Sequence, residues 1–173
     1  MNDLLLLATL LGGPKHGYAL KKQAGLISGQ PDMHNNLVYP LLRRFVDSGL
    51  VSQRQAAGQR GQTREIYTLT AAGKKEILRR AVQFTERNAS SDSEFSLRVG
   101  LFGLLQVAQR RAILQVRSQW LETWDEKFDR LQTGMNIGEW GGEVVRFLRA
   151  RIHAEQKWIA GLEHKLKKHE KRK

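Results

Sequence analysis

A helix followed at once by a hairpin, within residues 35–73, is the feature that most constrains the fold of this chain. Apolar residues recur at helical spacing over 37–46, and Gly49 ends that pattern. Two short segments, 51–55 and 65–69, have the composition of strands and are joined by a polar loop with glycines for turning. A helix with a basic hairpin directly behind it is typical of a winged helix, in which the helix enters a DNA major groove and the hairpin reaches the neighbouring backbone or minor groove. The pattern therefore predicts DNA binding.

The distribution of charge agrees with this prediction. The chain has 173 residues and a formal net charge of +12. Residues 1–90 contain 13 Lys and Arg against 6 Asp and Glu, a balance of +7, whereas residues 91–163 contain 10 of each. Residues 164–173 contain 6 against 1, a balance of +5, which is also typical of a solvated helix end. A basic surface attracts DNA phosphates whatever the base sequence.

Composition argues against several other classes of protein. The chain has no cysteine, which excludes disulfides, zinc fingers and thiol catalysis and agrees with a cytoplasmic location. The apolar run 4–11 is too short to span a bilayer, and Asp3 before it argues against a secretory signal, so we expect no membrane association. We interpret this run as a buried first helix. No histidine lies at metal-ligand spacing from carboxylates, and no nucleophile elbow, phosphate-binding loop or dinucleotide fingerprint occurs, so we expect no enzyme, metal or cofactor.

The chain divides at a small, polar stretch, residues 88–93. There Ser91 and Glu94 form a capping-box pattern that predicts a new helix beginning at Phe95. We predict a mainly α protein with an N-terminal winged helix-turn-helix domain, 1–88, whose wing has two strands, and a C-terminal helical dimerisation and effector domain, 89–173. The N-terminal helices are expected at about 2–11, 16–27, 34–48 and 71–87, the last capped by Thr70.

The C-terminal half follows helical spacing. An apolar stripe at steps of three and four covers 113–131, and glycines at 134, 138, 141 and 142 predict a long loop after it. A near-heptad seam then predicts a final helix of roughly 25 residues, about 37 Å long. So long a helix needs a partner surface, most simply a second copy of the chain. The predicted dimer interface consists of Leu148, Ile152, Ile159, Leu162 and Leu166.

The first 73 residues resemble the PadR family of bacterial transcriptional regulators. The segments that carry the resemblance are Leu4–Leu11, Gly17-Tyr18-Ala19-Leu20, Val38-Tyr39-Pro40-Leu41-Leu42-Arg43-Arg44, Asp47-Ser48-Gly49-Leu50-Val51 and Tyr67-Thr68-Leu69-Thr70 with Gly73. Downstream, Glu94-Phe95 and the context of Trp158 are similar to the helical C-terminal domain of the family. The resemblance implies a dimeric winged helix-turn-helix repressor whose last helix, with the first, forms the dimer interface. In many relatives a small, often aromatic molecule relieves repression.

The sequence departs from the family pattern at two places. Leu37 stands where the family usually has a hydroxyl residue, and His34 where it often has Ser or Thr, which leaves His34, Asn35 and Asn36 as the polar groups at the helix entrance. Glu65 and Ile66 make the wing less basic than is usual, so Arg60 and Arg64 carry more of its charge.

The candidate DNA contacts lie on the second and third helices and the wing. Asn35 and Asn36 can donate to and accept from adenine edges, although Asn is also a common helix N-cap. Tyr39 lies one turn further along, where its hydroxyl can reach a phosphate; the alternative is a buried ring. The complete predicted set is Lys21, Asn35, Asn36, Tyr39, Arg43, Gln59, Arg60 and Arg64.

Trp120 and Trp124 are four residues apart and share one helix face. They either pack in the core or the dimer interface, as large aromatics commonly do, or hold a flat aromatic effector by stacking. From these observations and the resemblance we predict a repressor that binds an operator as a homodimer and is released by a small molecule. The alternative is a winged-helix protein–protein interaction module without sequence-specific DNA binding.

Overall fold

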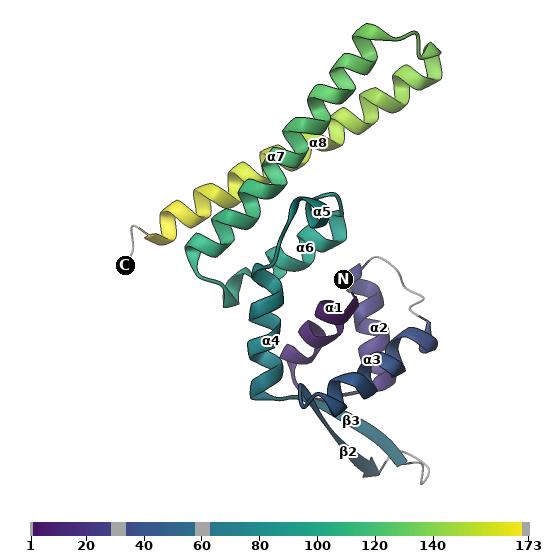
Figure 1. Cartoon of the computed structure of the whole chain (residues 1–173), viewed down its shortest axis with the longest axis vertical. Coiled ribbons are helices and arrows are strands. Elements are labelled where there is room, and N and C mark those ends of the chain that lie inside the picture. Colours follow the sequence, from purple (N-terminus) through teal and green to yellow (C-terminus); the bar gives the residue numbers. More distant parts are fainter. Residues whose placement is uncertain (1, 29–33, 58–62, 171–173) are drawn as a thin grey trace. The chain divides into compact units, whose positions relative to one another are not determined.

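The structure is a computed structural model that describes residues 2–28, 34–57 and 63–170 (Figure 1). The chain is mainly helical and forms two compact units. The first, which we call the winged-helix unit, consists of Met1–Gln83 and Asp92–Leu105. The second, which we call the helical unit, consists of Phe84–Ser91 and Gln106–Lys173. No helix within the described ranges is long and apolar enough to cross a membrane.

The winged-helix unit has its core between the N-terminal helices. Its helices are α1 (Asn2–Thr9), α2 (Gly17–Ser28), α3 (Asn35–Asp47), α4 (Ala71–Val82) and α6 (Asp92–Gly100), with short 3-10 helices η1 (Leu10–Gly12) and η3 (Phe102–Leu104). Leu4, Leu5, Leu6 and Leu7 are all buried, which confirms the prediction of a buried first helix. Burial on every side explains why α1 shows no polar face in the sequence.

Three antiparallel strands form one sheet in the order β1-β3-β2. These are β1 (Lys15–His16), β2 (Val51–Ala57) and β3 (Thr63–Leu69). The hairpin has the register Val51↔Leu69, so both predicted strands are confirmed and each is two residues longer than expected. β1 pairs Lys15 with Tyr67 at the base of the wing and was not predicted, because two residues are too few to show alternation.

Local hydrogen bonds fix the direction in which the wing leaves α3 and enters α4. Gly49 ends α3 with a left-handed φ of 70°, and its amide donates to the carbonyl of Val46. Thr70 caps α4 as predicted, since its hydroxyl accepts from the amide of Gly73 at 3.0 Å. A Cβ on Gly73 would lie 2.2 Å from the carbonyl oxygen of Leu50, so the close approach of α4 to the end of α3 requires glycine there.

α4 ends at Val82, earlier than the predicted 87. The backbone leaves the helix at Gln83, and a capping box between Thr85 and Asn88 begins a separate short helix, α5 (Glu86–Ala89). Thr85 and Asn88 depart from the usual pattern of Ser or Thr followed three residues later by Glu or Gln, so the sequence pattern does not predict this helix. α6 begins at Asp92, three residues before the predicted start at Phe95, with Ser91 directly before it.

Two long helices, α7 (Val107–Gly134) and α8 (Gly138–Glu170), lie side by side in the helical unit (Figure 1). The predicted long loop is wrong, because only residues 135–137 separate these helices and Gly141 and Gly142 lie within α8. A glycine costs about 1 kcal/mol inside a helix, and packing along the rest of a long helix can offset that cost.

The near-heptad seam of α8 faces α7 of the same chain. Val145, Ile152, Ile159 and Leu166 recur every seven residues and are buried against α7, while Leu148 and Leu162 are half-buried. The seam is therefore buried within a single chain and does not need a second copy of the chain to cover it. A heptad seam specifies that a helix packs on another helix, and it does not specify to which chain that helix belongs.

Candidate nucleic-acid interface

α3 separates an apolar face from a polar one. Val38, Leu41, Leu42 and Phe45 are buried in the core of the winged-helix unit. Asn35, Asn36, Tyr39 and Arg43 are all exposed, as their prediction as DNA contacts requires. Asn36 and Arg43 are seven residues apart, two helical turns, so they lie on the same outward face.

The two asparagines at the start of α3 differ in their surroundings. His34 is the N-cap residue, so the alternative interpretation of an asparagine as N-cap is wrong. Lys21 of α2 donates from Nζ to Oδ1 of Asn35 at 3.1 Å, which occupies the acceptor of that side chain. Asn36 extends from the exposed face, where its amide group can approach a base edge.

Two neighbouring arginines also have different surroundings. Arg44 forms an ion pair with Asp3 of α1, and Arg80 of α4 reaches the same carboxylate at 3.1 Å. Asp3 therefore joins three helices of the winged-helix unit, α1, α3 and α4. Arg43 is exposed one residue earlier in α3 and faces outward.

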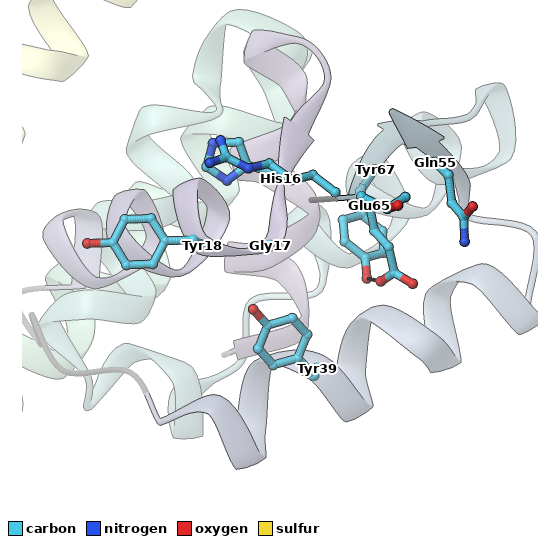
Figure 2. Close-up of a pocket in the computed structure, with 9 residues that line it drawn as sticks. His16, Gly17, Tyr18, Tyr39, Gln55, Glu65 and Tyr67 are labelled. Atoms are coloured by element: carbon cyan, nitrogen blue, oxygen red, sulfur yellow. Dashed lines mark hydrogen bonds between the residues drawn. The ribbon is translucent and has the colours of Figure 1, made fainter. Parts of the chain in front are cut away.

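A cavity of about 530 Å³ lies between the start of α2, α3 and the wing (Figure 2). Its lining residues are His16, Gly17, Tyr18, Tyr39, Gln55, Thr63, Arg64, Glu65 and Tyr67. The structure thus brings together two predicted contacts from different elements, Tyr39 of α3 and Arg64 of β3. It also adds wing and α2 residues that single-sequence reasoning did not place in a site, because only the pairing of β1 with β3 brings them together.

Tyr39 lies at the edge of this cavity and not in the core. Tyr39 is 38% exposed, so the alternative of a buried ring is wrong. A Cβ on Gly17 would lie 2.8 Å from Cε1 of Tyr39, which means that the ring packs closely on the backbone at the start of α2. His16 precedes that helix and caps it, since its Nδ1 accepts from the amide of Ala19 at 3.2 Å.

A hydrogen bond fixes the wing side of the cavity. Tyr67 is 3% exposed, and its hydroxyl donates to Oε2 of Glu65 at 2.7 Å. Burial first, and the neighbouring Glu65 carboxylate second, raise the pKa of the Tyr67 hydroxyl well above its ordinary value, so it stays a neutral donor. The other predicted wing residues, Gln59 and Arg60, lie outside the described residues.

The predicted effector residues belong to a row of aromatic rings on α7. The ring centroids of Trp120 and Trp124 are 5.8 Å apart, and Phe128 follows at 5.6 Å from Trp124. Both tryptophans are half-buried, and each has a cation over its ring: Arg117 at 4.7 Å and Lys127 at 4.6 Å. Their faces therefore already have partners within the chain.

Arg117 connects this row to α5 and α8. Its side chain is 1% exposed, and its guanidinium donates to both carboxylate oxygens of Glu155 at 2.8 and 2.6 Å. The same group donates to the carbonyl of Ala89 in α5. A buried charge needs such partners, so Arg117 holds the helical unit together at the level of Trp120.

The fold is that of a winged helix, and comparison with known proteins specifies the class of protein. The family described as transcriptional regulator PadR-like matches residues 6–79. A transcriptional regulator from Thermoplasma acidophilum is 32% identical over 44% of this chain and 72% of that one, with a TM-score of 0.41. This chain belongs to the PadR-like family of transcriptional regulators, and it is not an enzyme.

Two solved structures of PadR from Bacillus subtilis are similar over most of the chain. The structure in complex with operator DNA is 16% identical, covers 92% of this chain and 94% of that one, and has a TM-score of 0.47. The structure in complex with p-coumaric acid is 16% identical, and the match covers 95% of this chain and 98% of that one, with a TM-score of 0.42. No curated protein matches the chain.

Proposed function

We propose that this regulator represses transcription by binding an operator as a homodimer and that a flat aromatic molecule releases it from the DNA. The observation that carries the proposal is the outward face of α3, where Asn36, Tyr39 and Arg43 are exposed while the opposite face is buried. A helix anchored in this way presents polar side chains at a fixed orientation, which a major groove requires.

The roles of the DNA-contacting residues follow from their positions. Asn36 reads a base edge, and Arg43 contacts a guanine or a phosphate one turn beyond Tyr39. The hydroxyl of Tyr39 and the guanidinium of Arg64 bind phosphates at the two sides of the cavity. Lys21 already donates to the side-chain oxygen of Asn35, so we expect Asn35 to contribute mainly through its amide nitrogen. Gln59 and Arg60 remain predicted contacts of the wing.

The proposed dimer uses a face of α8 beside the one that packs on α7. Trp140, Val144, Phe147 and Trp158 are exposed, and with Arg151 and Ala154 they follow steps of four and three along one side of the helix. We call this set the α8 stripe. From Trp140 to Trp158 it extends about 27 Å. Exposed apolar surface of this kind is typical of protein interfaces.

The occupant we propose for the α8 stripe is the same stripe of a second copy. In an interface around a two-fold axis, each copy contributes the same surface, so that surface must fit itself. An apolar row along a straight helix can pack on the same row of a second copy. Two copies joined in this way can hold their α3 helices at the spacing of successive major grooves, about 34 Å. The half-buried Leu148 and Leu162 border the stripe and extend the contact.

The proposed effector acts on the aromatic row of α7. A planar aromatic molecule that stacks on Trp120 or Trp124 competes with the cations that now cover those rings, among them Arg117. Arg117 also binds the carbonyl of Ala89, so displacing it loosens α5, the short helix between α4 and α6. This gives a physical route from ligand to DNA-binding unit. By linkage, the ligand must bind the DNA-free form more tightly by the same factor as it weakens DNA binding.

One selection experiment tests operator binding. Genomic and random DNA fragments that the purified protein retains are sequenced, and the enriched sequence is then titrated beside a scrambled duplex of equal length. Enrichment of one motif with two half-sites supports the proposal. Uniform retention, or none, favours an interaction module that has lost sequence-specific binding.

A fluorescence experiment tests the effector site. All four tryptophans belong to the helical unit, so quenching by an aromatic acid such as p-coumaric acid reports on that unit alone. Saturable quenching that Trp124→Ala abolishes, with DNA binding intact in the absence of ligand, supports the site. If Trp124→Ala instead lowers the melting temperature and impairs DNA binding directly, the tryptophans are packing residues, since truncation of a buried Trp costs about 3–5 kcal/mol.

A further inference from the structure

A carboxylate lies on the DNA-facing side of a strongly basic unit. Glu65 lines the cavity between α3 and the wing, together with Tyr39 and Arg64. Figure 2 shows its carboxylate beside the hydroxyl of Tyr67, on the side of the wing that faces α3. Because side chains alternate along a strand, Glu65 and Tyr67 lie on the same face of β3.

A hydrogen bond from the wing orients this carboxylate. The buried hydroxyl of Tyr67 donates to it at 2.7 Å, and Tyr67 itself is packed into the unit. The pairing register sets Gln55 of β2 opposite Glu65, so the neighbour across the hairpin is neutral. Among the described residues, no lysine or arginine forms an ion pair with Glu65 within 4.0 Å.

An oriented, unneutralised carboxylate repels any phosphate that approaches the cavity. Each half-site of DNA must approach the outward face of α3 and the wing, and Glu65 lies between them. Like charges that are brought close across an interface lower its affinity and suppress unwanted partners. Glu65 therefore opposes the general attraction that the basic residues of this unit create.

We propose that Glu65 weakens the binding of each half-site, so that stable binding requires both winged-helix units of a dimer to engage DNA at once. This inference rests on the proposed function. When the affinity for each half-site is low, a dimer bound through one unit dissociates readily. Stable binding to DNA then depends on the gain in affinity when the second unit binds as well. An effector that changes the spacing of the two units can then release the protein completely.

Charge-neutral substitution of Glu65 tests the proposal. Glu65→Gln keeps an oxygen that accepts from Tyr67 and removes the charge. Binding is measured by fluorescence anisotropy on a random-sequence duplex long enough for two half-sites, over a series of salt concentrations. At a separation of about 6–8 Å in water, loss of one repulsion increases affinity roughly threefold per half-site, hence about tenfold for a dimer that engages both. The gain should shrink as salt rises, because salt screens exposed charges.

Two further variants control the experiment. Glu65→Lys should increase affinity beyond Glu65→Gln, since attraction then replaces repulsion. Glu86→Gln changes the net charge by the same amount at an exposed position of the helical unit and should leave affinity unchanged. Equal melting temperatures of the four proteins show that folding is unaffected.

The outcomes separate this inference from the proposed function. If wild type binds duplex DNA and Glu65→Gln binds it equally or more weakly, the proposed role of Glu65 is wrong, while the proposed DNA-binding function is unaffected. An equal gain for Glu86→Gln would also overturn it, because the effect would then reflect net charge alone. If neither wild type nor Glu65→Gln retains any duplex at low salt, the proposed function fails together with the inference.

Discussion

The two units of this protein expose opposite kinds of surface. The winged-helix unit exposes Asn36, Tyr39 and Arg43 on α3 and Arg64 on the wing, all able to bind a polyanion. The helical unit exposes Trp140, Phe147 and Trp158 along α8, which suit a protein partner. Under the proposed function, the first unit contacts DNA and the second joins two copies of the chain. The aromatic residues also separate spectroscopically, because all three tyrosines belong to the first unit and all four tryptophans to the second.

Among substitutions to alanine, the largest expected effect concerns Arg117 of the helical unit. Arg117→Ala leaves the Glu155 carboxylate and the Ala89 carbonyl without their donor, which should destabilise the helical unit by about 3–5 kcal/mol. Urea unfolding followed by tryptophan fluorescence should shift accordingly. Operator affinity should fall as well, because Arg117 no longer holds α5 and the proposed dimer depends on the helical unit. An unshifted tryptophan transition would show that Arg117 does not hold this unit together.

Disruption of the α8 stripe tests the proposed dimer. Phe147→Glu puts a charge in the centre of the stripe and should raise the dimer dissociation constant roughly 30-fold or more, about 2 kcal/mol, without unfolding the chain. Analytical ultracentrifugation measures the change, and operator affinity should fall with it. Ala160→Glu, exposed on the side of α8 opposite the stripe, is the matched control.

Ile159→Glu provides the contrast with the seam that faces α7. Ile159 is 2% exposed within the chain, so this substitution should unfold the helical hairpin instead of yielding a folded monomer. A folded, monomeric Ile159→Glu protein would show that the seam and not the α8 stripe forms the dimer.

The two asparagines of α3 test base recognition. Asn36→Ala should cost about 1–3 kcal/mol on the preferred operator and leave random-duplex binding unchanged. Asn35→Ala should cost less, because Lys21 already occupies the acceptor of that side chain. Titration of both variants on operator and scrambled DNA compares them directly. If Asn36→Ala lowers the affinity for operator and for scrambled DNA equally, Asn36 contacts the DNA backbone and does not read a base.

Arg64 tests the wing with an effect that does not depend on base sequence. Arg64→Ala should weaken binding to all duplexes alike and reduce the slope of log affinity against log salt by about 0.9 for each lost phosphate contact. Anisotropy titrations over a salt series measure that slope. An unchanged affinity and slope would remove Arg64 from the interface.

The smallest expected effect is a pH dependence of the winged-helix unit. Hydrogen bonds from Arg79, and then Arg80, lower the pKa of the Glu76 carboxyl from 4.5 to about 2. Its stabilising contribution is therefore complete above the ordinary pKa and is lost as the pH falls towards 2. Thermal unfolding between about pH 6 and pH 2 should show a smaller acid destabilisation for Glu76→Gln than for wild type. Glu122→Gln, exposed on α7, should show the wild-type dependence.

The sequence by itself determined the features that depend on residues close together in the chain. The amphipathic period of α3, the glycine that ends it, the two strands of the wing and the Thr70 cap each depend on residues within a few positions of one another, so they could be predicted. The same holds for the exposure of Asn36, Tyr39 and Arg43, which follows from helical periodicity once the buried face is known.

Only the tertiary structure decided which distant groups meet. The pairing of β1 with β3, the packing of Tyr39 on Gly17, the bond from Lys21 to Asn35 and the burial of Arg117 join residues far apart in the chain. The seam of α8 shows the limit most clearly, because periodicity gave its face while the short turn at 135–137 brought α7 onto it. A hydrophobic pattern states that a surface must be buried, and the three-dimensional path of the chain selects what buries it.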